Sequence, residues 1–514
     1  MGKFMFIQNR FMKLILFFFI VLGACKGNLE SRHNPSGFKT PLPEKDFDSY
    51  KNKTRIQIEK ATGGKLEEKW IDKRLPFEYK PDDAKCADLM PYKGALLIHG
   101  LTDTPFIMSD LGERFKEKCY WVRSILLPGH GTIPGDLLDV DYEEWVKAID
   151  AGVDSFQGKA EEIYLVGFST GTSLSLHYVL RKKNPKSIKG LVFLAPGIKE
   201  KSHLGFVASL IAGIGNIIPK VAWLEIHPDE DKVKYESFTA NAGAQFHSLT
   251  KNLRELAEGT PAITIPTFMA ISSADATVDS DQARIFFCKI TENAKNQMIW
   301  YTAKEKKDDP KETCGGFIVK RVRNLDAGIL DYAHLSLPVH PDNIYYGRNG
   351  EYKSCLTYSK FSYINEQDDP NLKKCKEGKI GFKNSLMYGE HTNENKQDYV
   401  VRRLTFNPMF NEMMKDIFKF NQSIIDCTSD LVCAYKPNIA FYEALGWDGL
   451  NALEKTISYI RTNAPNVPII GDGKRGDIIS TNESYAKALF EFWDFDATTI
   501  NPFSGLETLS LSTL

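Results

Sequence analysis

Short apolar runs alternate with amphipathic stretches along the first two thirds of the chain. The runs are four to ten residues long and carry no charge, which is typical of strands that are buried on both faces. The stretches between them have the period of helices. The runs cover residues 94–98, 163–166, 190–194 and 263–272, and the helical stretches cover residues 141–156 and 172–182. This pattern predicts a doubly wound α/β domain, in which helices cover both faces of a mostly parallel sheet.

The N-terminal apolar run is of a different kind. Residues 14–22 follow Met12-Lys13 without a charge, and they are long enough for a signal-peptide core but too short to span a bilayer core of about 30 Å. The run ends in Leu22-Gly23-Ala24-Cys25, which resembles the lipobox of bacterial lipoproteins. That resemblance implies a signal peptide over residues 1–24, a lipid on Cys25 and attachment to a membrane of the bacterial cell envelope, in the periplasm or at the outer membrane. An ordinary signal peptide with an unrelated cysteine is the alternative.

The pattern divides the rest of the chain into three parts. Residues 25–60 are polar and rich in Pro, Gly and Lys, which predicts a tether. The α/β domain follows over residues 61–419, and residues 420–514 form a separate segment. Inside the domain, residues 204–218 are apolar and uncharged, residues 345–398 are polar and indicate surface loops, and residues 402–418 are amphipathic again.

Composition and charge narrow the functional classes. The chain has 514 residues, with 65 Lys and Arg against 66 Asp and Glu, so its net charge is −1. Such a balance argues against a charge-driven nucleic-acid-binding protein, and no nucleic-acid partner is expected. Apart from Cys25, six of the nine cysteines precede residue 400, an even number that suits disulfides in an oxidising compartment. Their pairing cannot be read from the sequence, and their spacing does not favour a zinc site.

A candidate nucleophile lies directly between an apolar strand and a helix. Residues 167–171 read Gly-Phe-Ser-Thr-Gly, with Ser169 at the centre. A serine on a strained strand-to-helix turn exposes its hydroxyl, and flanking glycines remove the Cβ atoms that would clash there. The context therefore predicts a nucleophile elbow rather than a structural turn.

A base and an orienting acid must follow the serine in the order Ser, Asp or Glu, His. Asp275 comes just after the strand within residues 263–272 and is favoured as the acid, with Asp279 as the alternative. His334 is favoured as the base, with His340 as the alternative.

The oxyanion hole of such a site is built from backbone N–H groups. We expect one from Thr170, the residue after the serine, and one from Leu101, in the loop after the first strong strand. His99 begins this loop, and we interpret it as a buried, hydrogen-bonded residue that shapes the loop rather than as a base or metal ligand.

These motifs, with Leu-Pro-Gly-His-Gly at residues 127–131, resemble the α/β-hydrolases of the monoacylglycerol lipase and carboxylesterase branch. The likeness covers about residues 90–340, and it implies Ser169 as nucleophile, Asp275 as acid and His334 as base. Thr170 is a departure, since that branch often has Met or Gln there. The resemblance also implies a cap at about residues 200–260, an apolar ester substrate hydrolysed through an acyl-enzyme, and no cofactor.

A second group of charged residues lies near the C-terminus. Lys436 ends one expected strand, residues 433–436, and Asp472, Lys474 and Asp477 follow another, residues 467–470. A third strand is expected at residues 497–500. Because charged side chains at the carboxyl edge of a βα sheet are placed where such folds perform chemistry, this array is a candidate site.

The amino-acid sequence of this segment closely resembles that of bacterial orotidine 5′-phosphate decarboxylase. In that family the four matching residues surround the orotate ring, the lysine matching Lys474 protonates the carbanion, and the aspartate matching Asp477 reaches across a dimer interface, without cofactor or metal. The likeness covers about residues 420–514, whereas a (β/α)₈ barrel has about 250 residues as a rule. The family's ribose-binding aspartate and phosphate-binding arginine have no match, so we interpret the segment as a partial barrel from a recombined or truncated gene.

Three functional hypotheses follow. The first is an envelope lipoprotein that acts as a serine hydrolase and carries an inactive barrel fragment. The second is an orotidine 5′-phosphate decarboxylase of pyrimidine synthesis, or a bifunctional protein, for which the charged array argues and the expected export argues against. The third is a non-catalytic surface lipoprotein on a hydrolase scaffold, since a fold does not imply a function.

Overall fold

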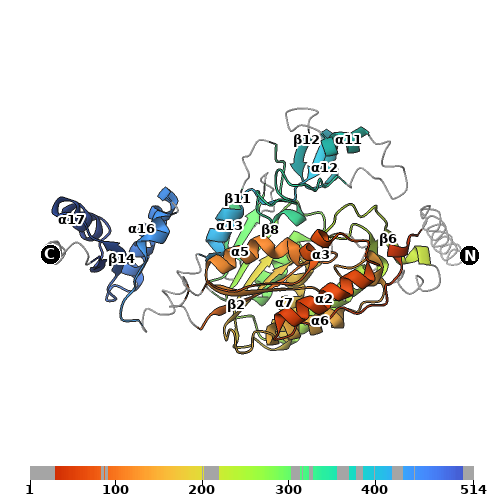
Figure 1. The fold of residues 1–514 in the computed structure, drawn as a ribbon, viewed down its shortest axis with the longest axis horizontal. Coiled ribbons are helices and arrows are strands. Elements are labelled where there is room, and N and C mark those ends of the chain that lie inside the picture. Colours follow the sequence, from red (N-terminus) through yellow and green to blue (C-terminus); the bar gives the residue numbers. More distant parts are fainter. Residues whose placement is uncertain are drawn as a thin grey trace, which may run out of the picture. The chain divides into compact units, whose positions relative to one another are not determined.

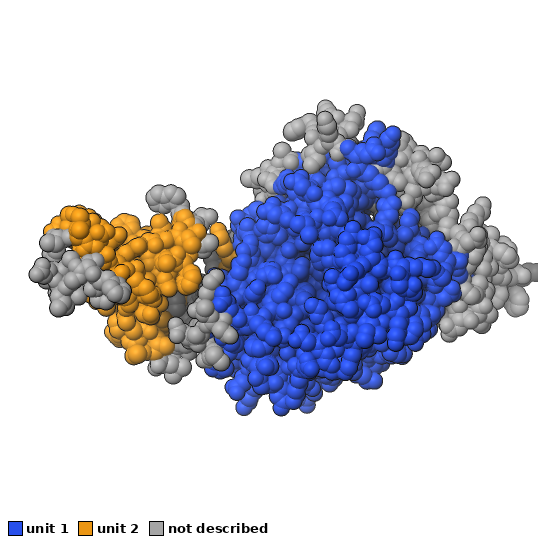
Figure 2. All heavy atoms as spheres, in the orientation of Figure 1, with its two compact units in different colours: residues 1–413 blue, residues 414–514 orange. Residues whose placement is uncertain are grey.

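The chain divides into two compact units, residues 1–413 and residues 414–514 (Figure 2). The computed structural model describes residues 29–82, 86, 91–199, 201, 219–293, 295–302, 313–314, 317–322, 328–355, 370–377, 386–398, 400–418, 432–444 and 446–501. The expected signal peptide, Cys25 and the apolar residues 204–218 lie outside this part of the chain. No helix in the described part is long and apolar enough to cross a membrane.

Nine strands among the described residues of the first unit form one sheet (Figure 1). Their order is β1-β3-β2-β4-β5-β8-β9-β11-β10, and all neighbours are parallel except β1 with β3 and β10 with β11. The strands are β1 (Phe77–Tyr79), β2 (Lys93–Ile98), β3 (Tyr120–Ile125), β4 (Ile163–Phe168), β5 (Ile188–Leu194), β8 (Thr267–Ser272), β9 (Gln297–Tyr301), β10 (Thr313–Cys314) and β11 (Phe317–Val322). The predicted doubly wound sheet is confirmed, and β2, β4, β5 and β8 lie within or close to the apolar runs.

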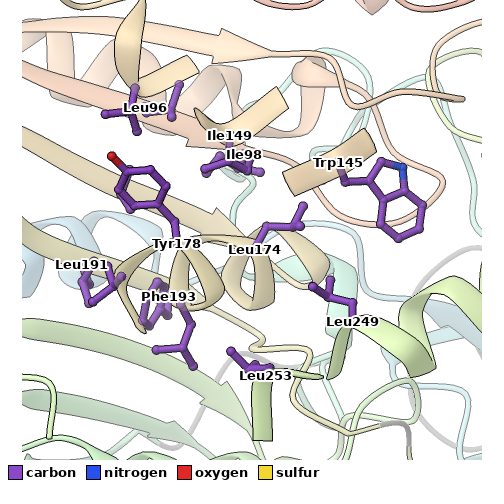
Figure 3. Packing of buried hydrophobic residues seen from close by; sticks show 14 of the residues in the cluster. Leu96, Ile98, Trp145, Ile149, Leu174, Tyr178, Leu191, Phe193, Leu249 and Leu253 are labelled. Atoms are coloured by element: carbon purple, nitrogen blue, oxygen red, sulfur yellow. The ribbon is translucent and has the colours of Figure 1, made fainter. Parts of the chain in front are cut away.

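Helices α6 (Tyr142–Asp154), α7 (Thr170–Arg181) and α9 (Ala240–Gly259) contact one another next to the sheet. Their apolar side chains meet those of β2 and β5 in one core (Figure 3), which includes Leu96, Ile98, Ile149, Leu174, Leu191, Phe193, Leu249 and Leu253. Each large apolar side chain that is fully buried contributes about 1.5–3 kcal/mol. This core fixes the position of α7 against the sheet. Other helices of the unit are α2 (Phe47–Ala61), α3 (Glu68–Arg74), α5 (Ser109–Glu117), α10 (Ser280–Ile290), α11 (Pro370–Glu377) and α12 (Asn393–Asp398). Helix α13 (Phe410–Phe418) spans the boundary between the two units.

The predicted tether over residues 25–60 is wrong for its described part, which begins at residue 29. His33 is buried against Trp223, and Ser36 donates to Asp136. Helix α2 begins at Phe47, after Asp46 caps it by accepting a hydrogen bond from the Ser49 N–H, and it packs against the domain. Its buried face consists of Phe47, Tyr50, Thr54, Gln57 and Ile58. Because two of these five side chains are polar, the face has no apolar periodicity in the sequence.

The expected cap over residues 200–260 is too long. Helix α9 packs against α7, and Leu249 and Leu253 are fully buried in the main core, so residues 240–259 belong to the domain itself. Before it, β6 (Trp223–Glu225) and β7 (Phe238–Thr239) form a small antiparallel sheet.

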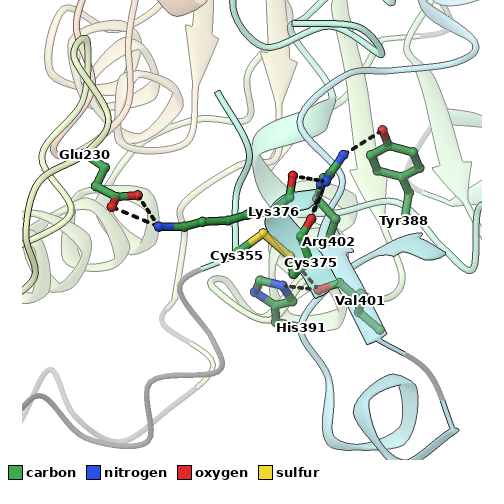
Figure 4. The surroundings of a disulfide bond; sticks show 8 residues. All are labelled: Glu230, Cys355, Cys375, Lys376, Tyr388, His391, Val401 and Arg402. Carbon is green, nitrogen blue, oxygen red and sulfur yellow. Dashed lines mark hydrogen bonds and ion pairs between the residues drawn. A yellow bond between two sulfur atoms is a disulfide. The ribbon is translucent and has the colours of Figure 1, made fainter. Parts of the chain in front are cut away.

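The region expected to form surface loops, residues 345–398, contains buried structure. Strand β12 (Leu386–Gly389) pairs in parallel with β13 (Val400–Arg403), and Leu386 and Tyr388 are buried. A disulfide joins Cys355 to Cys375 beside these strands (Figure 4), and another joins Cys86 to Cys119. Since residues 400–403 form a strand, the amphipathic pattern expected over residues 402–418 becomes helical only at α13.

The second unit has a small apolar core of its own. Helices α15 (Ile439–Glu443), α16 (Gly446–Asn463) and α17 (Ile479–Ala486), with a π-helix at Lys487–Phe492, accompany the parallel strands β14 (Ile470–Arg475) and β15 (Ala497–Ile500). Residues 433–436 do not form the expected strand but make a single parallel bridge from Tyr435 to Ile469. Pro437 and Pro468 lack N–H groups, which limits the ladder there. The unit is part of a (β/α)-type fold.

Candidate active site

Ser169 lies in the turn between β4 and α7. Its backbone has φ 53° and ψ −116°, a conformation that costs a residue with a side chain about 1–3 kcal/mol. A Cβ on Gly171 would lie 2.1 Å from the carbonyl oxygen of Ile98, and one on Gly167 would lie 2.6 Å from the carbonyl carbon of Gly171. The two glycines therefore allow β2, β4 and α7 to approach closely, and the surrounding core holds the strained serine at the carboxyl edge of the sheet.

The structure brings Ser169, Asp275 and His334 together at this edge. Ser169 Oγ lies 2.9 Å from His334 Nε2, and His334 Nδ1 lies 2.6 Å from Asp275 Oδ2. Asp275 is fully buried, and its other carboxylate oxygen accepts hydrogen bonds from the N–H groups of Thr277 and Val278. When Nδ1–H donates to Asp275, Nε2 is left as the acceptor for the serine hydroxyl. The arrangement can remove the hydroxyl proton and stabilise the imidazolium that forms.

The loop after β2 lies against Ser169. A Cβ on Gly100 would be 3.1 Å from Ser169 Cβ, a tight contact, so the glycine favours this approach. Leu101 follows in the same loop, and Thr170 is the first residue of α7, so both residues singled out for the oxyanion hole lie next to the serine in the fold.

His99 is fully buried at the start of this loop. Its Nε2 accepts a hydrogen bond from the Leu127 N–H, and its Nδ1 lies 2.8 Å from the Gly100 carbonyl oxygen. Burial holds the pKa of His99 well below its usual range, so the ring is neutral. His99 therefore joins the loops after β2 and β3, which is a structural contribution.

In the second unit, Asp472 on β14 lies between two lysines. Lys436 Nζ is 3.0 Å from one carboxylate oxygen, and Lys474 Nζ is 2.8 Å from the other, which also accepts a hydrogen bond from Thr499. The hydrogen bond from Lys474, with those from Thr499 and Lys436, holds the pKa of Asp472 well below its usual range. The Asp477 carboxylate instead accepts from the N–H of the next residue. Both lysine side chains are more than half exposed, at 54% and 66%.

A comparison with known families bears on the first unit. Residues 91–303 match the model of the family described as "Serine aminopeptidase, S33". The first unit has an α/β-hydrolase fold, and it is similar to this family over those residues. Similar solved structures include the metagenome-derived lipolytic enzymes LipS and LipT, at 19% identity and a TM-score of 0.37, covering 44% of this chain and 87% of that one. Another is the monoacylglycerol lipase of Paleococcus ferrophilus, at 20% identity and a TM-score of 0.35, again covering 44% and 87%.

The chain's second unit matches a different family. Residues 416–511 match the orotidine 5′-phosphate decarboxylase / HUMPS family. The decarboxylase of Cellvibrio japonicus is 48% identical over 107 residues, which are 20% of this chain and 38% of that protein. The decarboxylase of Parabacteroides distasonis is 50% identical over 93 residues, 18% of this chain and 33% of that protein. The chain thus spans about a third of the length of these relatives.

The two alternatives for the triad make hydrogen bonds elsewhere. Asp279 is the N-cap of α10, and its carboxylate accepts a hydrogen bond from the Gln282 N–H at 3.0 Å. His340 Nδ1 accepts a hydrogen bond from the Asp342 backbone N–H, and the backbone N–H of His340 donates to the Asp110 carboxylate.

Sequence reasoning missed an ion pair beside the Gly100 loop of the hydrolase domain. Lys234 Nζ lies 2.9 Å from Asp103, whose side chain is 3% exposed, and the Tyr235 N–H donates to the Thr102 carbonyl oxygen at 2.9 Å. Residues 234 and 235 therefore hold the loop that lies against the serine. Asp103 could have been noticed because it lies three residues after Gly100. Its partner Lys234 lies 131 residues later in the sequence, and no motif marks it.

Proposed function

We propose that the hydrolase domain cleaves carboxylic esters through an acyl-enzyme on Ser169. The hydrogen-bonded chain from Ser169 through His334 to Asp275 carries this proposal. Ser169 Oγ attacks the ester carbonyl carbon while its proton passes to His334 Nε2. The tetrahedral intermediate then expels the alcohol, which takes that proton, and water releases the acid by the same steps. The N–H groups of Leu101 and Thr170 stabilise the oxyanion.

The proposed substrate is a small ester with an apolar acyl group. Residues 204–218 support this choice, because they contain no charge and lie between β5 and α9, where a segment can cover the carboxyl edge of the sheet. An apolar, uncharged segment at this place in the sequence favours a substrate with an acyl chain.

The test is to incubate the full chain with a fluorophosphonate probe and to map the adduct by mass spectrometry. We expect one adduct, on Ser169. A chain that stays unlabelled would instead support the hypothesis of a non-catalytic surface lipoprotein.

We propose that the protein is anchored to an envelope membrane by a lipid on Cys25. The motif Leu22-Gly23-Ala24-Cys25 at the end of an apolar run supports this. Mass spectrometry of the membrane fraction should find a diacylated peptide that begins at Cys25, and Cys25→Ser should remove it. A soluble protein with another mature N-terminus would contradict the anchor.

We propose that the second unit does not decarboxylate orotidine 5′-phosphate, although Lys436, Asp472 and Lys474 lie together. An enzyme of this kind draws on binding energy from remote groups of its substrate, of which the phosphate is the largest, and the matching residues span 38% and 33% of the two decarboxylases compared above. The exposed lysines are also screened by water.

The measurement is turnover of orotidine 5′-phosphate by the full chain, purified from a host without its own decarboxylase. We expect no turnover above background. Turnover that Lys474→Ala removes would show that the charged array is active, and the protein would then be bifunctional.

A further inference from the structure

A fully buried carboxylate touches the loops of both the acid and the base. Glu390 follows β12 and is 0% exposed. Its Oε2 accepts a hydrogen bond from the His334 N–H at 3.0 Å and from the Ala276 N–H at 3.5 Å, and its Oε1 accepts from the His391 N–H at 2.9 Å. One side chain therefore contacts the backbone of the base and that of the residue after the acid Asp275.

Arg403, at the end of β13, completes this contact. Its Nε lies 2.8 Å from Glu390 Oε1 and its Nη2 lies 3.1 Å from Oε2, while Nη2 also donates to Thr277 Oγ1 at 3.0 Å. Burial alone would raise the pKa of Glu390, but the charge and hydrogen bonds of Arg403, with the N–H groups of His334 and His391, hold it at about 2. The carboxylate of Glu390 is therefore ionised, and paired with Arg403, at every pH at which ester hydrolysis would be measured.

The same segment supports the base loop in other ways. The Leu330 N–H donates to the Tyr388 carbonyl oxygen, and the Tyr388 N–H donates to that of Gly328, both at 2.7 Å. Asp331 accepts hydrogen bonds from the Glu390 N–H and from the Asn395 side chain. Residues 386–398 and 400–403 therefore support the loop of His334, although they follow the part of the chain that matches the hydrolase family.

We propose that Glu390 and Arg403 are positioning residues that fix the loop of Asp275 relative to the loop of His334. This inference rests on the proposed ester hydrolysis. The ion pair also balances charge next to the triad. The charged or titratable groups that face His334 are Asp275 from the loop after β8, Glu390 after β12 and Arg403 on β13, with Lys201 donating to the Asp275 carbonyl oxygen.

Opposite single substitutions should shift the pH profile in opposite directions. Glu390→Gln leaves the positive Arg403 beside the triad, which disfavours the imidazolium of His334 and moves the acid limb of kcat/KM to lower pH. Arg403→Gln removes that positive charge and moves the limb to higher pH. We expect shifts of about 0.5–1 pH unit and a kcat lower by about 10–100-fold, because the loops also lose their register.

The experiment measures kcat and kcat/KM of the full chain on a p-nitrophenyl ester between pH 5 and 9. The double variant Glu390→Gln/Arg403→Gln should restore the position of the acid limb while kcat stays low. Arg403→Lys keeps the charge, so it should lower kcat without moving the limb. The exposed pair Arg114 and Glu117, 3.0 Å apart on α5, offers matched controls, and Arg114→Gln and Glu117→Gln should change neither quantity.

Two results would overturn the proposal. One is a wild-type kcat and profile in both single variants. The other is a shift in the same direction in both, or an equal shift in Arg403→Lys, which would indicate a general loss of structure. If the wild-type chain is not labelled at Ser169 by the probe, the proposed hydrolysis itself is wrong, whereas a labelled wild type with unaffected variants refutes only the role of the pair.

Discussion

Ser169→Ala should lower kcat for ester hydrolysis by about 10⁶-fold, the loss seen when a catalytic serine of this kind is removed. The methyl group cannot attack the carbonyl, and the His334 Nε2 that now faces Ser169 Oγ at 2.9 Å loses its partner. The turn itself should persist, because alanine meets the same backbone demands as serine. The measurement is turnover of a short p-nitrophenyl ester together with labelling by the fluorophosphonate probe.

Ser31→Ala is a suitable control for this variant, since Ser31 is exposed and lies outside the site. It should keep full turnover and labelling. Undiminished labelling of Ser169→Ala would show that another residue is the nucleophile.

Asp275→Asn should lower kcat by about 10⁴-fold while leaving the fold intact. An amide at this position can donate to Nδ1, so the proton moves to Nε2, which can then no longer accept the serine proton. Asparagine keeps an oxygen for the N–H groups of Thr277 and Val278, which bond to Asp275 at 2.8 and 2.9 Å. The measurement is kcat on the same ester, with thermal unfolding as the check on the fold.

The matched control is Asp279→Asn, four residues along the chain. Asparagine caps a helix as well as aspartate does, so α10 should be unaffected and kcat should stay at the wild-type value. A loss of activity in Asp279→Asn with a normal Asp275→Asn would mean that Asp279 is the acid.

Much of the sheet, and the residues of the triad, could be predicted from the sequence for physical reasons. Strands such as β4 are buried on both faces, so their composition alone marks them. Ser169 has a local signal in its two glycines. His334 lies 165 residues from Ser169, and Asp275 lies 59 residues from His334, and both could be found because the fold fixes their order along the chain. Strand ends and chain order are the features that a single sequence records well.

Contacts that depend on isolated polar residues could not be predicted from the sequence. Glu390 lies in a polar stretch without a motif, and it reaches His334 only because β12 pairs with β13 across ten intervening residues. Helix α2 was missed because Thr54 and Gln57 are part of its buried face. In both cases polar side chains occupy interior positions, and hydrophobic periodicity does not detect them.

The two faces of strand β13 contact different parts of the domain. Because successive side chains of a strand point to opposite faces, Arg402 and Arg403 extend in opposite directions. Arg402 donates to the Cys375 carbonyl oxygen beside the disulfide (Figure 4), and Arg403 holds Glu390. The crosslinked loop and the loop of His334 are therefore connected through two adjacent residues of one strand, since Glu390 in turn accepts a hydrogen bond from the His334 N–H.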